Sequence, residues 1–238
     1  MEFEYCIPSK GRAGLITSKK IFKDARLFVP LSEVTQYSQY SNVIGVPNEI
    51  KGITATRNYI LKSTTKNVFF IDDDLQFLGK HNRDIYKHKV ERITDIETIT
   101  NVVDKLFRVA DQMKSKILGL HTTSNNLTNY PNNPFLFNGV CLGSCMGVIN
   151  DGSYYFDEEF EVKEDYELSL RSIFDGVPTV KSNILFMQHE HTQRQGGCRD
   201  DRRIEKEKKA IKQLIKKYPG AIKQAKHRGT SFAIQLNL

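Results

Sequence analysis

Short apolar runs alternate with amphipathic stretches along the first half of the chain. The runs at 3–7, 27–29, 43–46, 67–71 and 117–120 predict strands. Between them, residues 53–64 and 94–114 carry apolar side chains at helical spacing, most clearly from Ile96 to Met113. Such alternation of strands and helices is typical of a mostly parallel sheet with helices on both faces. We therefore expect an α/β fold.

The second half of the chain is less regular. The pattern predicts a loop at 122–138, a glycine-containing strand within 135–149, a helix at 163–174, one or two strands at 179–187, a long helix at 199–217 and an edge strand at 232–236. Neither an internal repeat nor a clear linker divides the sequence. We therefore expect one α/β domain at 1–198, with a basic extension at 199–238 packed on it.

The amino-acid composition is typical of a globular protein. Of 238 residues, 39% are hydrophobic and 26% charged, as in globular proteins. No apolar run approaches the ~20 residues of a membrane span, and the acidic start is not typical of a signal peptide, so we expect a cytoplasmic protein. The four cysteines form no C-x-x-C pair and predict free thiols. A zinc site built from Cys141, Cys145 and a distant histidine is the alternative, although this spacing is not the usual one.

Positive charge is concentrated near the C-terminal end. Residues 199–228 hold twelve Lys or Arg and four Asp or Glu, a net charge of +8, whereas the whole chain carries +7. A cationic segment of this size attracts a polyanion such as nucleic acid. The alternative is a solvated, lysine-rich helix face.

Three consecutive aspartates, Asp72, Asp73 and Asp74, follow the apolar run at 67–71. Carboxylates this close raise one another's pKa unless a cation is present. Mg²⁺ and Mn²⁺ prefer oxygen ligands, and ligands of open α/β sheets bind at the carboxyl ends of the strands. The triplet therefore predicts a divalent metal site, with an acidic turn or helix cap as the alternative.

Other polar motifs are individually less specific. His189 and His191 follow the run at 179–187, where an imidazole nitrogen could complete a metal site. Arg57 could pair with a phosphate or with the acidic cluster. The 8–12 loop (PSKGR) offers backbone N–H groups, a hydroxyl and two cations, but lacks the spacing of a Walker loop or dinucleotide fingerprint. The acidic residues at 163–168 suit the first turn of a helix.

Together these motifs resemble one superfamily. Residues 52–58 (GITATRN) and 68–74 (VFFIDDD) resemble the donor-site signature of GT-A nucleotide-sugar glycosyltransferases, and residues 156–158 (FDE) and 164–171 (EDYELSLR) resemble the acceptor-side signature of the family 2 type. The resemblance extends over 3–195. Within the superfamily, the IPSKGR start and the basic C-terminal segment look most like phage enzymes associated with TET/JBP-type base modification. Those enzymes are thought to glycosylate hydroxylated pyrimidines in DNA.

The resemblance implies a GT-A (Rossmann-like) fold and a role for each candidate residue. A nucleoside-diphosphate sugar, UDP-linked in our prediction, would be bound by Pro8, Ser9, Arg12, Arg57, Asp72, Asp73 and Arg194. The metal ion, Mn²⁺ or Mg²⁺, would be held by Asp74 with His191 or His189. Asp165 would be the catalytic base of an inverting transfer, and the basic segment would hold the DNA acceptor. The protein would then work in the host cytoplasm, if the gene is carried by a phage.

Three other functions are compatible with parts of the sequence. The same chemistry could modify a glycan, a lipid-linked intermediate or a protein. A metal-dependent nucleotidyltransferase or nuclease also uses clustered carboxylates, although its carboxylates usually come from several strands. A non-catalytic nucleic-acid-binding protein would explain the charge but not the acidic motifs.

Overall fold

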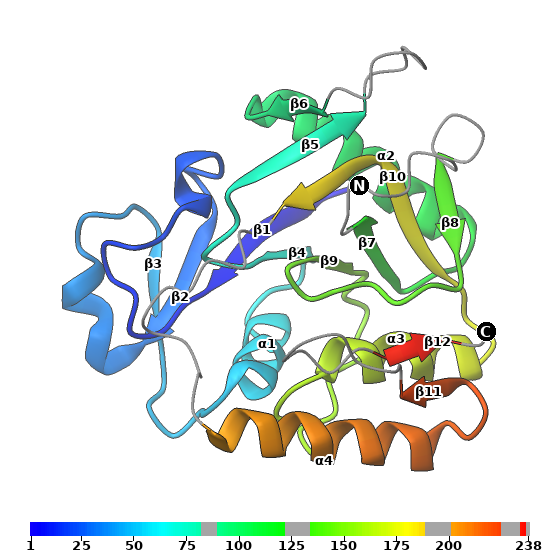
Figure 1. Ribbon diagram of the computed structural model, residues 1–238. Coiled ribbons are helices and arrows are strands. Elements are labelled where there is room, and N and C mark those ends of the chain that lie inside the picture. Colours follow the sequence, from blue (N-terminus) through cyan, green and yellow to red (C-terminus); the bar gives the residue numbers. More distant parts are fainter. Residues whose placement is uncertain (82–89, 122–133, 189–200, 225–233, 237–238) are drawn as a thin grey trace.

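The computed structural model describes residues 1–81, 90–121, 134–188, 201–224 and 234–236 (Figure 1). Its strands are β1 (Phe3–Pro8), β2 (Arg26–Pro30), β3 (Val43–Val46), β4 (Asn67–Ile71), β5 (Phe77–His81), β6 (Val90–Ile93), β7 (Ile117–His121), β8 (Phe135–Phe137), β9 (Cys145–Val148), β10 (Thr179–Gln188), β11 (Ile222–Gln224) and β12 (Ile234–Leu236). Its helices are α1 (Ile53–Lys62), α2 (Ile96–Gln112), α3 (Glu164–Phe174) and α4 (Asp201–Lys217), with short 3-10 helices η1 (Ser18–Lys20) and η2 (Leu31–Tyr37).

One large sheet runs in the order β3-β2-β1-β4-β9-β7-β10-β5-β6, with β8 paired to β10. The α/β class is confirmed, but the sheet is mixed rather than mostly parallel. Among its described strand pairs, four are parallel and five antiparallel. The difference arises at β9, which is antiparallel to both β4 and β7. The chain enters β9 from an irregular segment instead of the helical crossover that parallel neighbours require.

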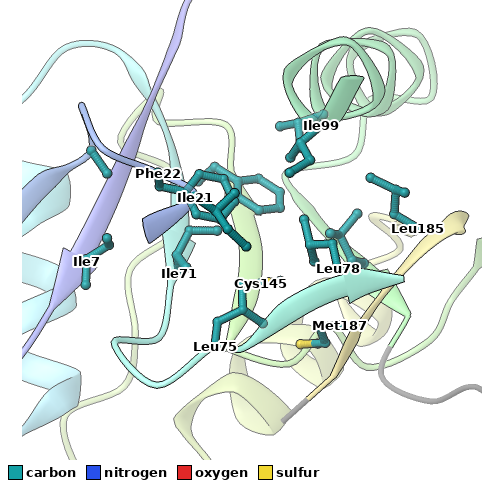
Figure 2. Packing of buried hydrophobic residues seen from close by; sticks show 14 of the residues in the cluster. Ile7, Ile21, Phe22, Ile71, Leu75, Leu78, Ile99, Cys145, Leu185 and Met187 are labelled. Carbon is teal, nitrogen blue, oxygen red and sulfur yellow. The ribbon is translucent and has the colours of Figure 1, made fainter. Parts of the chain in front are cut away.

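Alternate residues of the strands enter two different cores. Phe69 and Ile71 of β4 belong to the cluster covered by α2 (Figure 2). Val68 and Phe70 point to the opposite face, where they pack with residues of α1 and α3. The period of two along a strand produces this division, so α2 lies on one face of the sheet and α1 and α3 lie on the other.

The predicted helices in the first 198 residues are confirmed within two residues at their ends. The helix starting at Ile96 is capped by Asp95, whose carboxylate accepts a hydrogen bond of 2.8 Å from the N–H of Thr98. The strand expected within 135–149 is divided into β8 and β9. The sequence pattern does not predict strands β5 and β6, because their residues lack a strong apolar run.

The helix expected at 199–217 is observed as α4, which packs on the α3 side of the molecule (Figure 1). Ala210, Leu214 and Tyr218 form a cluster with Phe160 and with Leu170 of α3. The domain boundary at residue 198 stays a prediction. No helix in the described ranges is both long and apolar enough to cross a membrane.

Candidate active site

The loop after β1 meets the aspartate triplet at the end of β4. These two strands are parallel neighbours, with Cys6 opposite Phe70, so their carboxyl ends lie at the same edge. Pro8 ends β1 as a buried residue, and the Ser9 hydroxyl donates a 2.6 Å hydrogen bond to Oδ2 of Asp73. Arg12 Nη1 lies 2.6 Å from Oδ1 of Asp73. The predicted donor loop and the acidic motif therefore form one cluster.

Asp73 is the buried member of the triplet. Burial raises the pKa of its carboxyl group, against the lowering by the Ser9 hydrogen bond and the Arg12 charge. Tyr37 completes the cluster, because its hydroxyl oxygen accepts a 2.9 Å hydrogen bond from the backbone N–H of Arg12. Sequence reasoning missed Tyr37, which lies in η2 without a recognisable motif.

Asp72 and Asp74 are more exposed than Asp73. Their side chains are 37% and 46% exposed, whereas that of Asp73 is 10% exposed. Arg12 also reaches Asp74, with its Nη1 3.1 Å from Oδ2. The two outer carboxylates of the triplet therefore remain accessible at the strand end, while the middle one holds the β1 loop.

Arg57 joins the acidic strand end to α3. Its guanidinium group is buried, contacts Oε1 of Glu164, and lies 3.3 Å from Oδ1 of Asp72. The aromatic rings of Phe70 and Phe156 lie 5.7 Å and 5.6 Å from its Cζ. This arginine therefore connects three segments that are far apart in the sequence.

Two polar residues of α1 bring the chain before α3 within reach of Arg57. The Thr54 hydroxyl donates to the carbonyl oxygen of Phe160 at 2.6 Å, and the Asn58 side chain exchanges two hydrogen bonds with the backbone of Phe156. Both residues belong to the GITATRN motif, so the motif has a structural role as well as a predicted functional one.

Glu164 is buried at the first position of α3. Burial, assisted by the Asp165 and Asp72 charges and opposed by the Arg57 charge, raises the pKa of its carboxyl group to about 7. Sequence reasoning placed Glu164 among residues that suit a helix start. The 107-residue separation from Arg57 leaves no local signal for their contact.

Asp165 follows directly and is oriented by two backbone groups. Its Oδ2 accepts a 2.9 Å hydrogen bond from the N–H of Gly143, and its Oδ1 accepts a 2.8 Å bond from the N–H of Tyr166. Gly143 lies against Arg57, since an added Cβ would be 2.6 Å from the guanidinium Cζ. The predicted base is therefore held beside the cluster that contains Asp72.

The comparison with known families shows which family the chain belongs to. Residues 3–198 match the family model described as TET-Associated Glycosyltransferase. The chain belongs to this family. It is therefore a glycosyltransferase, an enzyme that moves a sugar from a donor to an acceptor. No curated protein matches the chain.

Part of the predicted site of this glycosyltransferase falls on residues that the structure does not describe. His189, His191 and Arg194 lie outside the described residues, so their roles stay predictions. Within the described ranges, no three His, Cys, Asp or Glu side chains are grouped so that they could hold a metal ion. Asp72 and Asp74 fit a hard divalent cation in donor type and exposure, but further ligands would have to come from elsewhere.

The cysteines of the transferase are free thiols where the structure describes them. Burial raises the pKa of Cys141 to about 12 and also raises the pKa of Cys145. Within the residues that the structure describes, neither thiol belongs to a group of three His, Cys, Asp or Glu side chains that could hold a metal ion, so the zinc alternative has no support there.

Proposed function

We propose that this glycosyltransferase moves a sugar from a nucleoside-diphosphate sugar, UDP-linked, to the hydroxyl of a hydroxylated or hydroxymethylated pyrimidine in DNA. The observation that carries the proposal is the convergence of the β1 loop, the aspartate triplet and Asp165 at one edge of the sheet. The family's association with TET enzymes supports a modified pyrimidine as acceptor.

The site holds more acidic than basic groups, and this excess favours binding of a cation together with the donor. Five carboxyl groups meet two guanidinium groups there: Asp72, Asp73, Asp74, Glu164 and Asp165 against Arg12 and Arg57. Glu164, with its pKa raised to about 7, is only partly ionised near neutral pH, but the carboxylates still outnumber the guanidinium groups. A diphosphate adds more negative charge, which this excess of carboxylate would repel. Asp74, with His191 or His189, would hold the metal ion, Mn²⁺ or Mg²⁺. When bound, the ion would supply positive charge to the leaving diphosphate, and Arg194 would add to it.

The donor nucleotide would lie along the β1 loop. Pro8 and Ser9 would form its wall, and Arg12 and Asp72 present polar groups at the same edge. Arg57 would add positive charge from the buried side of the site, because its guanidinium group lies between Asp72 and Glu164. Asp73 would act by holding Ser9 and Arg12 in place.

Asp165 would take the proton from the acceptor hydroxyl as its oxygen attacks the anomeric carbon. A positioned general base contributes typically 10²–10⁴-fold to a rate. The Gly143 N–H bond fixes the orientation of the carboxylate, which this step requires. Direct attack by the acceptor on the donor sugar gives inversion at the anomeric carbon.

The DNA would lie over α4. Lys209, Lys212 and Lys216 are exposed on this helix, whereas Ala210 and Leu214 are buried beneath it. Lysines contact phosphates without reading sequence. The target base would leave the stack to bring its hydroxyl to the sugar.

The test is a product assay by mass spectrometry. The protein, Mn²⁺ and a panel of UDP-sugars are incubated with DNA containing 5-hydroxymethylpyrimidines, and the digested nucleosides are weighed. We expect a pentose or hexose mass on a pyrimidine, which is lost in Asp74→Ala but kept in Asp111→Ala, a control on the exposed surface of α2.

Two other results have distinct meanings. Hydrolysis of a UDP-sugar without a DNA product would move the acceptor to a glycan, a lipid-linked molecule or a protein. No turnover of any nucleotide sugar would refute the proposed donor.

A further inference from the structure

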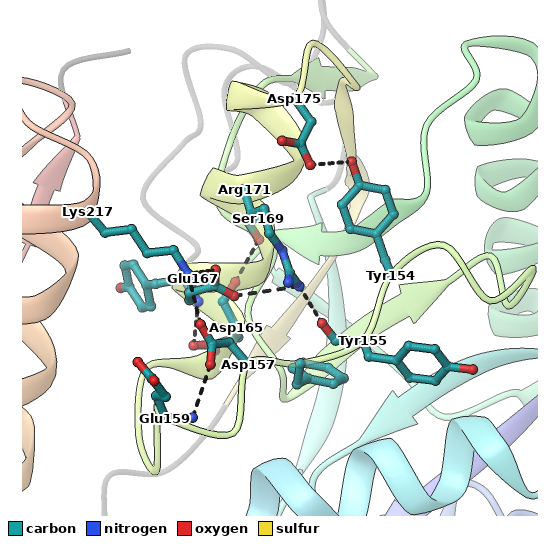
Figure 3. Close-up of polar contacts among 12 residues, drawn as sticks. Tyr154, Tyr155, Asp157, Glu159, Asp165, Glu167, Ser169, Arg171, Asp175 and Lys217 are labelled. Atoms are coloured by element: carbon teal, nitrogen blue, oxygen red, sulfur yellow. Dashed lines mark hydrogen bonds and ion pairs between the residues drawn. The ribbon is translucent and has the colours of Figure 1, made fainter.

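Helix α4 contacts the segment around Asp165 at two separate places. Near its start, Lys206 pairs with Glu161, and Glu207 Oε2 lies 3.1 Å from Nζ of Lys163. Near its end, Lys217 pairs with Asp157 and with Glu167, each at 2.8 Å (Figure 3). The contacts bracket the stretch that leads into α3 and contains Asp165.

The first contact involves a residue with an unusual backbone conformation. Lys163 has φ +63°, in the left-handed region, although it is not a glycine. It immediately precedes Glu164 and Asp165, so its dihedral angles set the direction in which α3 begins. Its side chain is only 15% exposed, and its ammonium group lies between Glu207 and the ring of Tyr166, 4.9 Å from the ring centroid. Strained backbone of this kind persists where the surroundings hold it.

The second contact fixes α3 two residues beyond Asp165. Glu167 is fully buried, and its Oε1 accepts hydrogen bonds from Lys217 Nζ at 2.8 Å and from the Tyr218 hydroxyl at 3.0 Å. Arg171, one turn further along, lies 3.7 Å from Oε2. A buried carboxylate with cationic and hydroxyl partners ties two helices together at a defined point.

We propose that α4 positions the catalytic base, with Glu207 holding Lys163 and thereby setting the orientation of Asp165. Glu207 is a positioning residue, since it acts through Lys163 and contacts no substrate. The inference rests on the proposed role of Asp165. It gives α4 a part in catalysis itself, in addition to holding the acceptor.

The test compares two substitutions on the same helix. Glu207→Ala removes the partner of Lys163, and Glu205→Ala removes an exposed glutamate that pairs only with Lys208 in the described part of the chain. Displacing a catalytic group slightly costs up to ~100-fold, and we expect about a tenfold lower kcat in Glu207→Ala. The KM for the UDP-sugar and the thermal unfolding midpoint should stay close to those of Glu205→Ala.

Introducing Glu207→Ala into a Lys163→Gly variant shows whether Glu207 acts through the backbone of residue 163 or has a general effect on the protein. Glycine adopts positive φ without strain, so Lys163→Gly needs no partner on α4 to keep this conformation. We expect Lys163→Gly to retain most of the wild-type kcat. Adding Glu207→Ala to this variant should then cause less than a twofold further loss.

Each contrary result has its own interpretation. If Glu207→Ala keeps kcat within twofold of Glu205→Ala, or loses as much activity in the glycine background as in the wild type, the positioning role is wrong. If wild type transfers sugar and Asp165→Asn does so equally well, the base assignment fails and this inference with it. Absence of transfer by the wild-type protein would overturn the proposed function first.

Discussion

The lysine stripe of α4, formed by Lys209, Lys212 and Lys216, offers the sharpest test of the DNA acceptor. Residues three and four apart lie on one side of a helix, and all three side chains are exposed. In the described part of the chain none of the three makes an ion pair, whereas neighbouring Lys206 and Lys208 pair with Glu161 and Glu205. The perturbation is replacement of the whole stripe by glutamine.

Counterion release sets the size of the effect. Each phosphate neutralised by a lysine contributes about 0.9 to the slope of log K against log salt concentration, so three lysines contribute ~2.7. Between about 50 mM and 200 mM salt, the wild-type protein should therefore lose ~40-fold more affinity than the variant does. The effect should be the same for unrelated DNA sequences, since phosphate contacts do not read bases.

The assay is fluorescence anisotropy with a labelled duplex at a series of salt concentrations. The control replaces Lys20, Lys23 and Lys105 by glutamine, which removes the same charge from exposed positions in η1, just after η1 and in α2. Segments around these lysines pack on the α2 face of the sheet, opposite α1 and α3. Equal changes of slope in both variants would mean that only overall charge matters. An unchanged slope in the stripe variant would refute DNA binding by this face.

Two further predictions concern the site and the stability of the fold. Gly143→Ala should displace the guanidinium of Arg57, because the new Cβ would lie 2.6 Å from its Cζ. We expect destabilisation of about 1–3 kcal/mol in urea unfolding, together with a lower kcat because the Gly143 N–H holds Asp165; unchanged stability would contradict the close packing. Partial burial opposes ionisation of Asp151, but the hydrogen bonds from Lys116 and Ser153 and the charge of Lys116 together outweigh this, and the pKa falls to about 2. Asp151 therefore stabilises the fold fully above the usual aspartate pKa of 3.8, and this contribution is lost as the pH falls through about 2. Asp151→Asn should lose less stability than wild type on acidification from pH 4 to pH 2, by under ~1 kcal/mol for this exposed pair; parallel curves would refute the assignment.

The sequence predicts the acidic edge of the site because the relevant signals are local. An apolar run ending in three aspartates indicates a buried strand with carboxylates at its end. The resemblance to GT-A glycosyltransferases, and not the pattern, assigns the 8–12 loop and the triplet to one donor site; the pairing of β1 with β4, whose carboxyl ends coincide, comes from the structure. The structure agrees, with Ser9 and Arg12 on the carboxylate of Asp73. The family match over 3–198 likewise agrees with motifs that are read in order along the chain.

The interior of the site depends on contacts that no local pattern contains. Arg57 and Glu164 are 107 residues apart, and each alone suits a solvated helix turn. The antiparallel strand β9 brings Gly143 against Arg57, and β9 itself follows an irregular segment without a helical period. Burial of an ion pair is decided by the packing of α1 against α3. The resemblance therefore names Asp165 as the candidate base, a role that stays a prediction, but the sequence contains no signal for the groups that orient it.

The charge of the C-terminal segment shows why composition alone is ambiguous. Counting residues gives +8 over 199–228, which fits equally well a polyanion-binding surface and a solvated helix. Lys206, Lys208 and Lys217 of α4 pair with carboxylates, whereas the outward lysine stripe makes no ion pair with any residue that the structure describes. The paired lysines hold α4 in place, so their charge is partly neutralised within the protein. The positive charge available to an acceptor is therefore smaller than the +8 counted over 199–228. This charge is concentrated on one face of α4, and the other contacts of the same helix hold the segment that contains Asp165.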